Sequence, residues 1–114
     1  IAPKAMLAGN ITVKDFVQIG MGAQIHQNLT IGEYSMIGMG SAIIKDVPPF
    51  SLCVGSPGKV KKLNNVKLER LGISKKLYQI LYDVIILEKP FRKFSVSKSE
   101  KKYLVILDNW FKKK

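Results

Sequence analysis

Cysteine, histidine and long apolar runs are nearly missing from this chain of 114 residues. The single cysteine, Cys53, can form no internal disulfide and has no spaced partners for zinc, so we expect a buried, inert thiol and no metal. The longest apolar stretch, Val84 to Leu87, is far too short to span a bilayer. The N-terminus lacks the layout of a signal peptide, so no targeting segment is visible. These absences argue against disulfide-stapled and membrane-spanning proteins.

Acidic residues are also scarce, with 8 Asp and Glu against 19 Lys and Arg, which gives a net charge of +11 at pH 7. Residues 1–56 hold three lysines and three acids, so the whole excess lies in residues 57–114. Such a positive field attracts an acidic partner and makes its binding sensitive to salt. Nucleic acid, an anionic membrane and an acidic carrier protein all fit the charge, and so does a merely solvated surface.

The first half of the chain carries a six-residue repeat. Every sixth position from residue 1 is a branched aliphatic, and the next position is small in most hexads. The aliphatic series is Ile1, Leu7, Val13, Ile19, Ile25, Ile31, Ile37 and Ile43. Neither the helical period nor simple alternation gives this spacing. The repeat therefore predicts short strands and turns stacked into coils.

Three hexads would make one triangular coil, with the aliphatics of successive coils stacked in a continuous interior and the small residues permitting tight corners. Eight hexads amount to fewer than three coils, near the lower limit for a stable solenoid. Because Ile1 already occupies an inward position, we expect the chain to begin inside a longer solenoid, or its open end to be covered. The hand of the coil does not follow from the pattern, since general chirality rules favour right-handed crossovers.

The solenoid is expected to end near Pro48 and Pro49, because two prolines remove backbone donors and force an extended path. Residues 50–54 read as a last strand, and residues 55–58 as the turn out of it. We therefore divide the chain into β-coils over residues 1–56 and a basic α-helical cap over residues 57–114.

Three helices are expected in the cap. The first runs from Val66 to Leu71, with Asn65 as its N-cap and Gly72 as its stop. The second begins after Ser74 and continues until Pro90. The third begins with a capping box over residues 97–100.

Two apolar stripes mark the second and third helices. Their residues are Leu77, Ile80, Leu81, Val84 and Ile85 in the second, and Tyr103, Leu104, Leu107, Trp110 and Phe111 in the third. Aromatic residues in a helical stripe are usually core, so Trp110 and Phe111 are expected to be buried. We expect the stripes to pack on each other and on the last coil, with the lysines outward.

Several segments of residues 1–76 resemble the hexapeptide-repeat acyltransferases, in particular the UDP-N-acetylglucosamine acyltransferases of lipid A biosynthesis. The segments Asp46-Val47-Pro48-Pro49-Phe50 and Val54-Gly55-Ser56-Pro57-Gly58 are shared by many hexapeptide acetyltransferases, whereas Leu63-Asn64 followed by Arg70-Leu71-Gly72-Ile73-Ser74 is more particular to the lipid A enzymes. Residues 7–16 and 19–27 match as well. The resemblance implies a fold that is mainly β with α, a left-handed parallel β-helix followed by a small C-terminal helical cap.

The resemblance also implies an activity and its partners. Such enzymes are homotrimers with active sites between neighbouring β-helices, and they move a β-hydroxyacyl group from acyl carrier protein to a hydroxyl of the nucleotide sugar in the bacterial cytoplasm. The acyl donor is held on the phosphopantetheine of acyl carrier protein or coenzyme A, and no tightly bound cofactor is implied. The family docks its acidic carrier on a lysine-rich cap, so the candidate contacts are Lys61, Lys62, Lys67 and Arg70, with Lys75 and Lys76 next.

Acyl transfer needs a base for the attacking hydroxyl and a donor for the thioester oxyanion. By resemblance, the backbone amide of Gly9 is the oxyanion donor, and Asn10 replaces a family histidine, so it can hold a substrate hydroxyl but cannot act as a base. The only histidine, His26, and its neighbour Gln27 match positions that contact substrate. The general-base histidine is expected upstream of residue 1.

Two further positions bear on specificity. Met39 falls where the family places its acyl-length ruler and predicts a short or medium acyl chain, with gap-filling core as the alternative. Leu71 replaces the second residue of a family arginine pair, which alters part of the carrier or nucleotide contact.

Two rival functions stay open. One is an acetyl-CoA-dependent nucleotide-sugar N-acetyltransferase on the same scaffold, which stimulation by acyl carrier protein at low salt would exclude. The other is a non-catalytic trimerising β-helix module, which the absence of further hexads and a histidine upstream would favour. Nucleic-acid binding is not expected, because no aromatic residues alternate with the lysines on a strand and no known motif is present.

Overall fold

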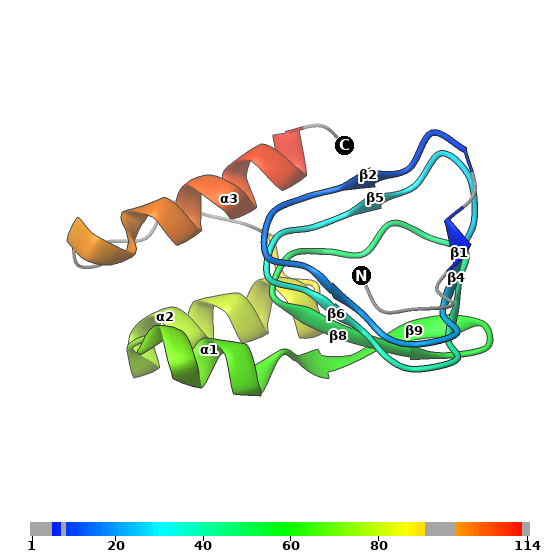
Figure 1. Ribbon diagram of the computed structural model, residues 1–114. Helices are drawn as coiled ribbons and strands as arrows, with labels where there is room; N and C mark the ends of the chain where they lie inside the picture. The colour runs from blue at the N-terminus through cyan, green and yellow to red at the C-terminus, as the bar shows by residue number, and fades with distance from the viewer. Residues whose placement is uncertain (1–5, 8, 91–97, 113–114) are drawn as a thin grey trace.

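Short strands at six-residue intervals form the first half of the computed structural model, which describes residues 6–7, 9–90 and 98–112 (Figure 1). Each strand pairs in parallel with a strand 18 residues away, so that Gln18 faces Met36 and Ile19 faces Ile37. The strands are β1 (Met6–Leu7), β2 (Thr12–Val13), β3 (Gln18–Ile19), β4 (Gln24–Ile25), β5 (Thr30–Ile31), β6 (Met36–Ile37) and β7 (Ala42–Ile43). Their sheets have the orders β1-β4-β7, β2-β5 and β3-β6-β8-β9. The predicted stack of three-sided coils is confirmed.

The interior of the coils is built from the repeating aliphatics. Ile19, Ile25, Ile31, Ile37 and Ile43 are all buried, and they form one cluster with Ala23, Val47 and Cys53. Val13 is half-buried against this cluster, whereas the side chains of Ile1 and Leu7 lie outside the described residues. Burying one such aliphatic stabilises a fold by about 1.5–3 kcal/mol, which explains why the same position recurs in every hexad.

The small residues beside the aliphatics let adjacent coils approach each other. A Cβ at Gly20 would lie 2.7 Å from the backbone nitrogen of Met39, and one at Gly32 would lie 2.5 Å from that of Pro49. The expectation that these small residues permit tight corners was wrong. The left-handed corner conformation belongs to other residues, among them Asn10, Asn28, Gly22 and Gly40.

Aromatic residues occupy the left-handed position of another corner. Phe16, Tyr34 and Phe50 have φ values of 61°, 61° and 62°, which is unusual for bulky side chains. Their rings stack in order, with centroids 4.9 Å apart for Phe16–Tyr34 and 5.5 Å apart for Tyr34–Phe50. Aromatic contacts of this kind contribute roughly 0.5–1.5 kcal/mol each beyond their burial, which offsets part of the backbone strain. We call these three residues the aromatic ladder.

A hairpin closes the coils. Strand β8 (Ser51–Gly55) pairs in parallel with β6, close to the predicted last strand, and β9 (Gly58–Leu63) turns back antiparallel to β8. Residues 58–63 were expected to lead directly into a helix, so the cap contains a strand as well as helices. The division at residues 56 and 57 stays a prediction.

The first cap helix, α1 (Asn65–Leu71), begins one residue earlier than predicted. Its N-cap is Asn64, whose side-chain oxygen accepts from the backbone N–H of Lys67. The amide group of Asn64 also donates to the carbonyl oxygen of Tyr34 at 2.9 Å, so a contact with the coils selects this residue over Asn65. Gly72 ends α1 with a φ of 68°, as predicted.

The second helix, α2 (Lys75–Leu81), is capped by the Ser74 hydroxyl, which accepts from the N–H of Leu77, as predicted. It continues as a π-helical segment, η1 (Tyr82–Ile86), before Pro90. A 3₁₀ turn, η2 (Lys98–Glu100), then leads into α3 (Lys101–Lys112). The backbone N–H and the hydroxyl of Ser74 both donate to the Glu100 carboxylate, at 2.8 Å and 2.7 Å, and so tie α2 to α3. Ser97 of the predicted capping box lies outside the described residues.

The helix stripes meet in a second core, as predicted. Its buried members are Phe50, Leu63, Leu68, Leu77, Leu81, Ile85, Tyr103 and Leu107. Trp110 is buried too, but Phe111 is 38% exposed, so the prediction that Phe111 is core was wrong. The described lysines of the cap are exposed except for Lys67, which is half-buried. No helix in the described part of the chain is long and apolar enough to cross a membrane.

Candidate active site

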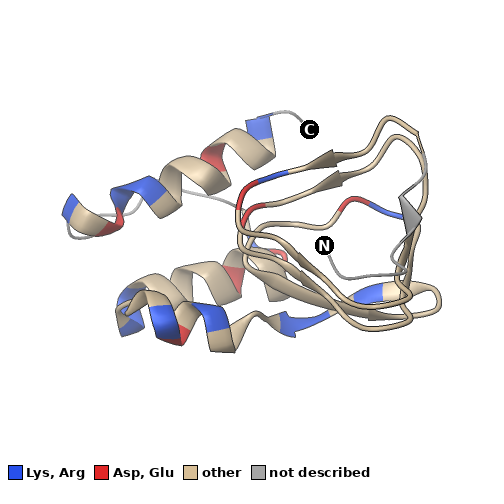
Figure 2. Cartoon of the chain, viewed as in Figure 1, with Lys and Arg blue, Asp and Glu red and all other residues tan. Residues whose placement is uncertain are grey.

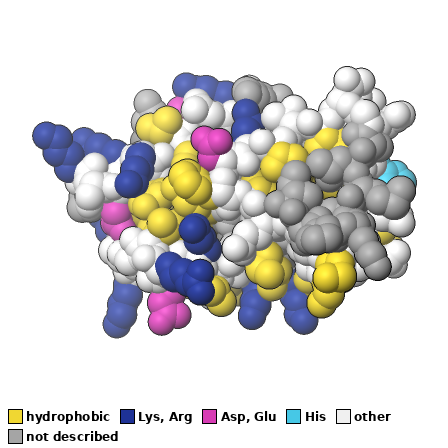
Figure 3. All heavy atoms as spheres, viewed as in Figure 1, with side chains coloured by type: hydrophobic (Ala, Val, Ile, Leu, Met, Phe, Trp, Pro, Cys, Tyr) yellow, Lys and Arg dark blue, Asp and Glu magenta, His cyan; other side chains and the backbone are white. Residues whose placement is uncertain are grey.

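Four of the predicted site residues lie at one corner of the coils. Gly9 and Asn10 form the turn after β1, and His26 and Gln27 follow β4, one coil later. The backbone N–H of Asn28 donates to the carbonyl oxygen of Gly9 at 3.2 Å, so the two turns are stacked. All four residues are exposed, and Figure 3 shows the histidine at the surface. We call these four residues the His26 corner.

The His26 corner can hold a polar ligand. A Cβ built on Gly9 meets nothing within 4 Å, so the backbone there is open to approach. Within the described part of the chain, no hydrogen bond occupies the side chains of Asn10, His26 or Gln27. An amide, an imidazole and a second amide therefore stand ready to donate to or accept from hydroxyl groups.

Met39 lies at a different corner. It sits in the turn after β6, stacked on Met21, whose carbonyl oxygen accepts from the N–H of Gly40 at 2.9 Å. Its side chain is 74% exposed, so the alternative that Met39 fills a gap in the core was wrong. Within one chain, Met39 does not join the His26 corner.

The predicted carrier contacts lie on the cap (Figure 2). Lys61 and Lys62 are exposed on β9, and Lys67 and Arg70 lie on α1. The amine of Lys67 is 5.8 Å from the centroid of the Phe16 ring and 5.9 Å from that of Tyr34, so part of its role is to cover the aromatic ladder. We call these four residues the basic surface.

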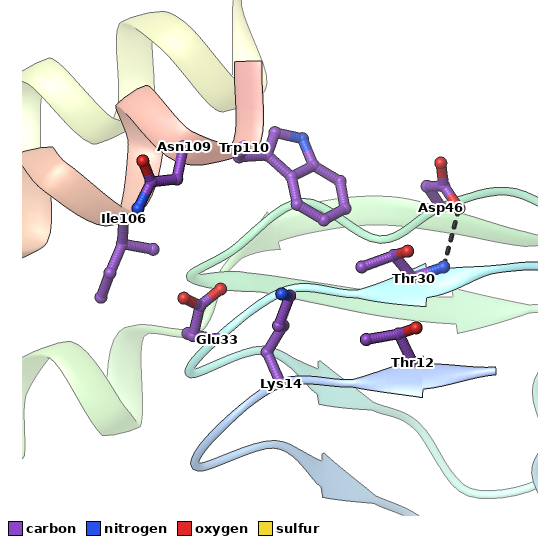
Figure 4. A pocket seen from close by; sticks show the side chains of 8 residues that line it. All are labelled: Thr12, Lys14, Thr30, Glu33, Asp46, Ile106, Asn109 and Trp110. Carbon is purple, nitrogen blue, oxygen red and sulfur yellow. Dashed lines mark hydrogen bonds between the residues drawn. The ribbon is translucent and has the colours of Figure 1, made fainter. Parts of the chain in front are cut away.

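A polar pocket between α3 and the β2–β5 sheet was not predicted (Figure 4). Its lining residues are Thr12, Lys14, Thr30, Glu33, Asp46, Ile106, Asn109 and Trp110. The sequence carries one signal of it, since Thr12 and Thr30 recur at the outward position 18 residues apart. Nothing in the sequence indicates that Asn109 and Trp110 of a distant helix would face them.

Cys53 is buried in the coil interior, as predicted, and burial raises the pKa of its thiol. Burial also raises the pKa of the Tyr34 hydroxyl, with smaller contributions from Tyr103, Asp15 and Glu33. Among the described residues, no three His, Cys, Asp or Glu side chains gather as a metal-ligand group.

Comparison with known proteins extends these observations. The family described as "Udp N-acetylglucosamine O-acyltransferase; Domain 2" matches residues 46–89, which span the end of the coils and the first two cap helices. The acyl-[acyl-carrier-protein]--UDP-N-acetylglucosamine O-acyltransferase of Thiobacillus denitrificans is 38% identical over 88 residues, covering 71% of this chain and 34% of that protein. The corresponding protein of Nautilia profundicola is 36% identical over 90 residues, covering 73% of this chain and 35% of that protein. The chain belongs to the hexapeptide-repeat acyltransferases.

Solved structures agree with this family. The structure of LpxA from Acinetobacter baumannii superposes with a TM-score of 0.68 at 32% identity, covering 84% of this chain and 36% of that one. The UDP-N-acetylglucosamine acyltransferase of Campylobacter jejuni gives a TM-score of 0.60 at 26% identity, covering 91% of this chain and 45% of that one. The chain thus spans about a third of the curated relatives' length, over both coils and cap.

Proposed function

We propose that the protein transfers a β-hydroxyacyl group from acyl carrier protein to a hydroxyl of UDP-N-acetylglucosamine, in the bacterial cytoplasm and as a step of lipid A biosynthesis. The observation that carries the proposal is a likeness to acyltransferases of that name that runs through both coils and cap. In this proposal the coils form a left-handed parallel β-helix, as the fold of these relatives suggests.

A homotrimer follows from where the candidate residues lie. The His26 corner, Met39 and the aromatic ladder that Lys67 covers occupy different corners of one prism. A single copy therefore holds only part of a site that needs an acceptor pocket, an acyl pocket and a carrier surface. Packing three copies side by side sets one corner of a copy against another corner of its neighbour, which would complete each site.

Each set of residues has a role in this proposal. The amide of Gly9 stabilises the thioester oxyanion, and Asn10, His26 and Gln27 hold the sugar, while the resemblance assigns the general base to a histidine of an earlier coil. Met39 shortens the acyl pocket between copies. The basic surface attracts the acidic carrier, whose phosphopantetheine brings the acyl group, so no tightly bound cofactor is needed.

The test is a transfer assay with β-hydroxyacyl carrier protein and UDP-N-acetylglucosamine, run on the 114-residue chain and on the complete gene product. We expect an O-acylated nucleotide sugar, formed faster at low salt. Transfer from acetyl-CoA to an amino sugar nucleotide would support the N-acetyltransferase instead. A trimer that turns over neither donor would support the non-catalytic module.

The basic surface can be tested by charge reversal. Lys61→Glu with Lys62→Glu should raise the KM for the acyl carrier about tenfold and leave its kcat unchanged, because the exposed lysines act on encounter. The matched control is Lys101→Glu with Lys102→Glu on α3, which changes the net charge equally but lies outside the basic surface. Equal effects of the two pairs would show that overall charge, and not this surface, draws the carrier.

The His26 corner can be tested with His26→Ala in the complete gene product. Because His26 is exposed and belongs to no core, the variant should fold normally and bind sugar or acyl donor more weakly. Unchanged kinetic constants would remove His26 from the site.

A further inference from the structure

The pocket between α3 and the β2–β5 sheet holds polar groups that the protein itself does not use. Hydroxyls of Thr12 and Thr30 stand side by side on paired strands, and the amine of Lys14 and the carboxylate of Glu33 flank them. In the described part of the chain, no side-chain hydrogen bond or ion pair engages these four groups or the amide of Asn109. Figure 4 shows Asn109 and Trp110 facing the strand residues from α3.

Such an arrangement is costly unless something binds there. Lys14 and Glu33 are half-buried and opposite in charge, yet they form no ion pair with each other. A half-buried charge that lacks a partner is unfavourable, and the usual remedies are a direct ion pair or solvent. The pocket instead keeps donors and acceptors apart, on both walls, around a cavity of about 340 Å³.

The chemistry of the lining selects the ligand. Threonine hydroxyls, a carboxamide, an amine and carboxylates together donate and accept many hydrogen bonds, which is what neighbouring hydroxyl groups of a ligand require. The buried indole of Trp110 and the side chain of Ile106 supply an apolar wall for ring C–H groups. Glu33 and Asp46 outnumber Lys14, so the pocket carries a net negative charge and disfavours a phosphate.

We propose that this pocket binds an unphosphorylated sugar ring, a hexose or a hexosamine. The volume lies within the range of small-molecule sites, at its lower end, which suits a single ring. Asp46 is already oriented, because one of its carboxylate oxygens accepts from the backbone N–H of Thr30 at 2.8 Å. None of the lining residues belongs to the His26 corner or the basic surface, so this binding is separate from the proposed acyl transfer.

The sole tryptophan of the chain lines the pocket, so its fluorescence reports directly on occupancy. We would titrate the 114-residue chain with glucose, glucosamine and N-acetylglucosamine, with myo-inositol, glycine and inorganic phosphate as comparison ligands. The expected result is a saturable change for at least one sugar, with a dissociation constant on the order of 1 mM. Phosphate and glycine should give no saturable change.

Variants then locate the binding. Glu33→Gln and Thr30→Val should each weaken sugar binding about tenfold, because each removes a hydrogen-bonding group that water cannot fully replace. Glu69→Gln on α1 is the matched control, since Glu69 is an exposed carboxylate outside the pocket, and it should bind sugar like the parent. Circular dichroism of each variant checks that the fold is retained.

Three results would overturn the proposal. The first is no saturable response to any sugar up to about 100 mM, a concentration far above that of a specific site. The second is a response of equal size to glycine or phosphate, which would mean a zwitterion or anion site. The third is unchanged sugar binding in folded Glu33→Gln and Thr30→Val. Because binding is measured without turnover, none of these results bears on the acyl transfer.

Discussion

Five isoleucines, at positions 19, 25, 31, 37 and 43, share one role at the residue scale. Each is the inward residue of a two-residue strand, and each is buried while its strand neighbour faces outward or is only partly covered. An interior packed this densely leaves a void when a side chain is shortened, since neighbours in three sheets cannot all move inward.

Ile31→Ala should therefore lower the free energy of unfolding by about 2–5 kcal/mol, the usual cost of such a cavity. Ile44→Ala is the matched control, because Ile44 is 44% exposed and should cost less than about 1 kcal/mol. Urea denaturation followed by circular dichroism measures both. Similar losses for the two variants would contradict the account of the coil interior.

Cys53 offers a pH-dependent test at the same scale. Burial raises the pKa of its thiol, so the folded state holds the proton more tightly than the unfolded state does. The stability that this proton confers is fully present below the unfolded pKa of about 8.5 and is lost as the pH rises through the higher folded value.

We expect Cys53 to react with a disulfide reagent at least about tenfold more slowly in native buffer at pH 8 than in denaturant, since little thiolate is present or accessible. The reaction rate should rise above pH 8.5 together with a fall in the free energy of unfolding. Stopped reactions followed by mass spectrometry check the rates. Equal rates in the two solvents would mean that the thiol is open to solvent.

At the scale of elements, the coils could be predicted because one side-chain type repeats at one spacing, from Val13 to Ile43. The Gly72 stop and the Ser74 cap were also predictable, because both act within one helical turn. The choice of Asn64 over Asn65 was not, since a bond to Tyr34, 30 residues away, decides it.

The rest of the candidate site depends on packing that no local signal carries. β9 forms because β8 offers it an edge, and the polar pocket exists because α3 lies over the β2–β5 sheet. The resemblance named Met39 and His26 together, yet one chain sets them at different corners. Sequence reasoning reached the residues and missed their arrangement.

Tyr103 joins two of these elements. Its ring lies edge-on to Tyr34 and Phe50, with centroids 6.0 Å and 5.9 Å away, and so attaches α3 to the aromatic ladder. Tyr103→Ala should cost about 3–5 kcal/mol and increase hydrogen exchange in α3 before that in the coils. Tyr103→Phe keeps the ring and should cost less than about 1 kcal/mol. If exchange in α3 is the same in both variants, the ladder does not hold the helix.

At the scale of the whole molecule, charge separates the two halves. The excess of positive charge lies in the cap, where the exposed pair of Lys112 and Asp108, 3.0 Å apart on α3, contributes little. Self-repulsion of a net charge of +11 therefore opposes compactness more than exposed ion pairs favour it.

Raising sodium chloride from about 20 mM to about 200 mM should therefore increase the Tm by a few degrees, because the Debye length shortens to below the spacing of many lysines. An equal osmolality of sucrose gives the control for solvent effects other than screening. A Tm that falls with salt would indicate that attractive pairs outweigh the repulsion.

The pairing of each strand with one 18 residues away also governs how such a protein can change in length. Duplicating one whole turn of the prism leaves every side chain on its original face and only adds height. Duplicating a single hexad rotates all that follows by a third of a revolution, which would carry His26 away from Gly9 without disturbing the interior. Growth in this architecture is thus neutral for folding at every six residues, but neutral for ligand recognition only at every eighteen.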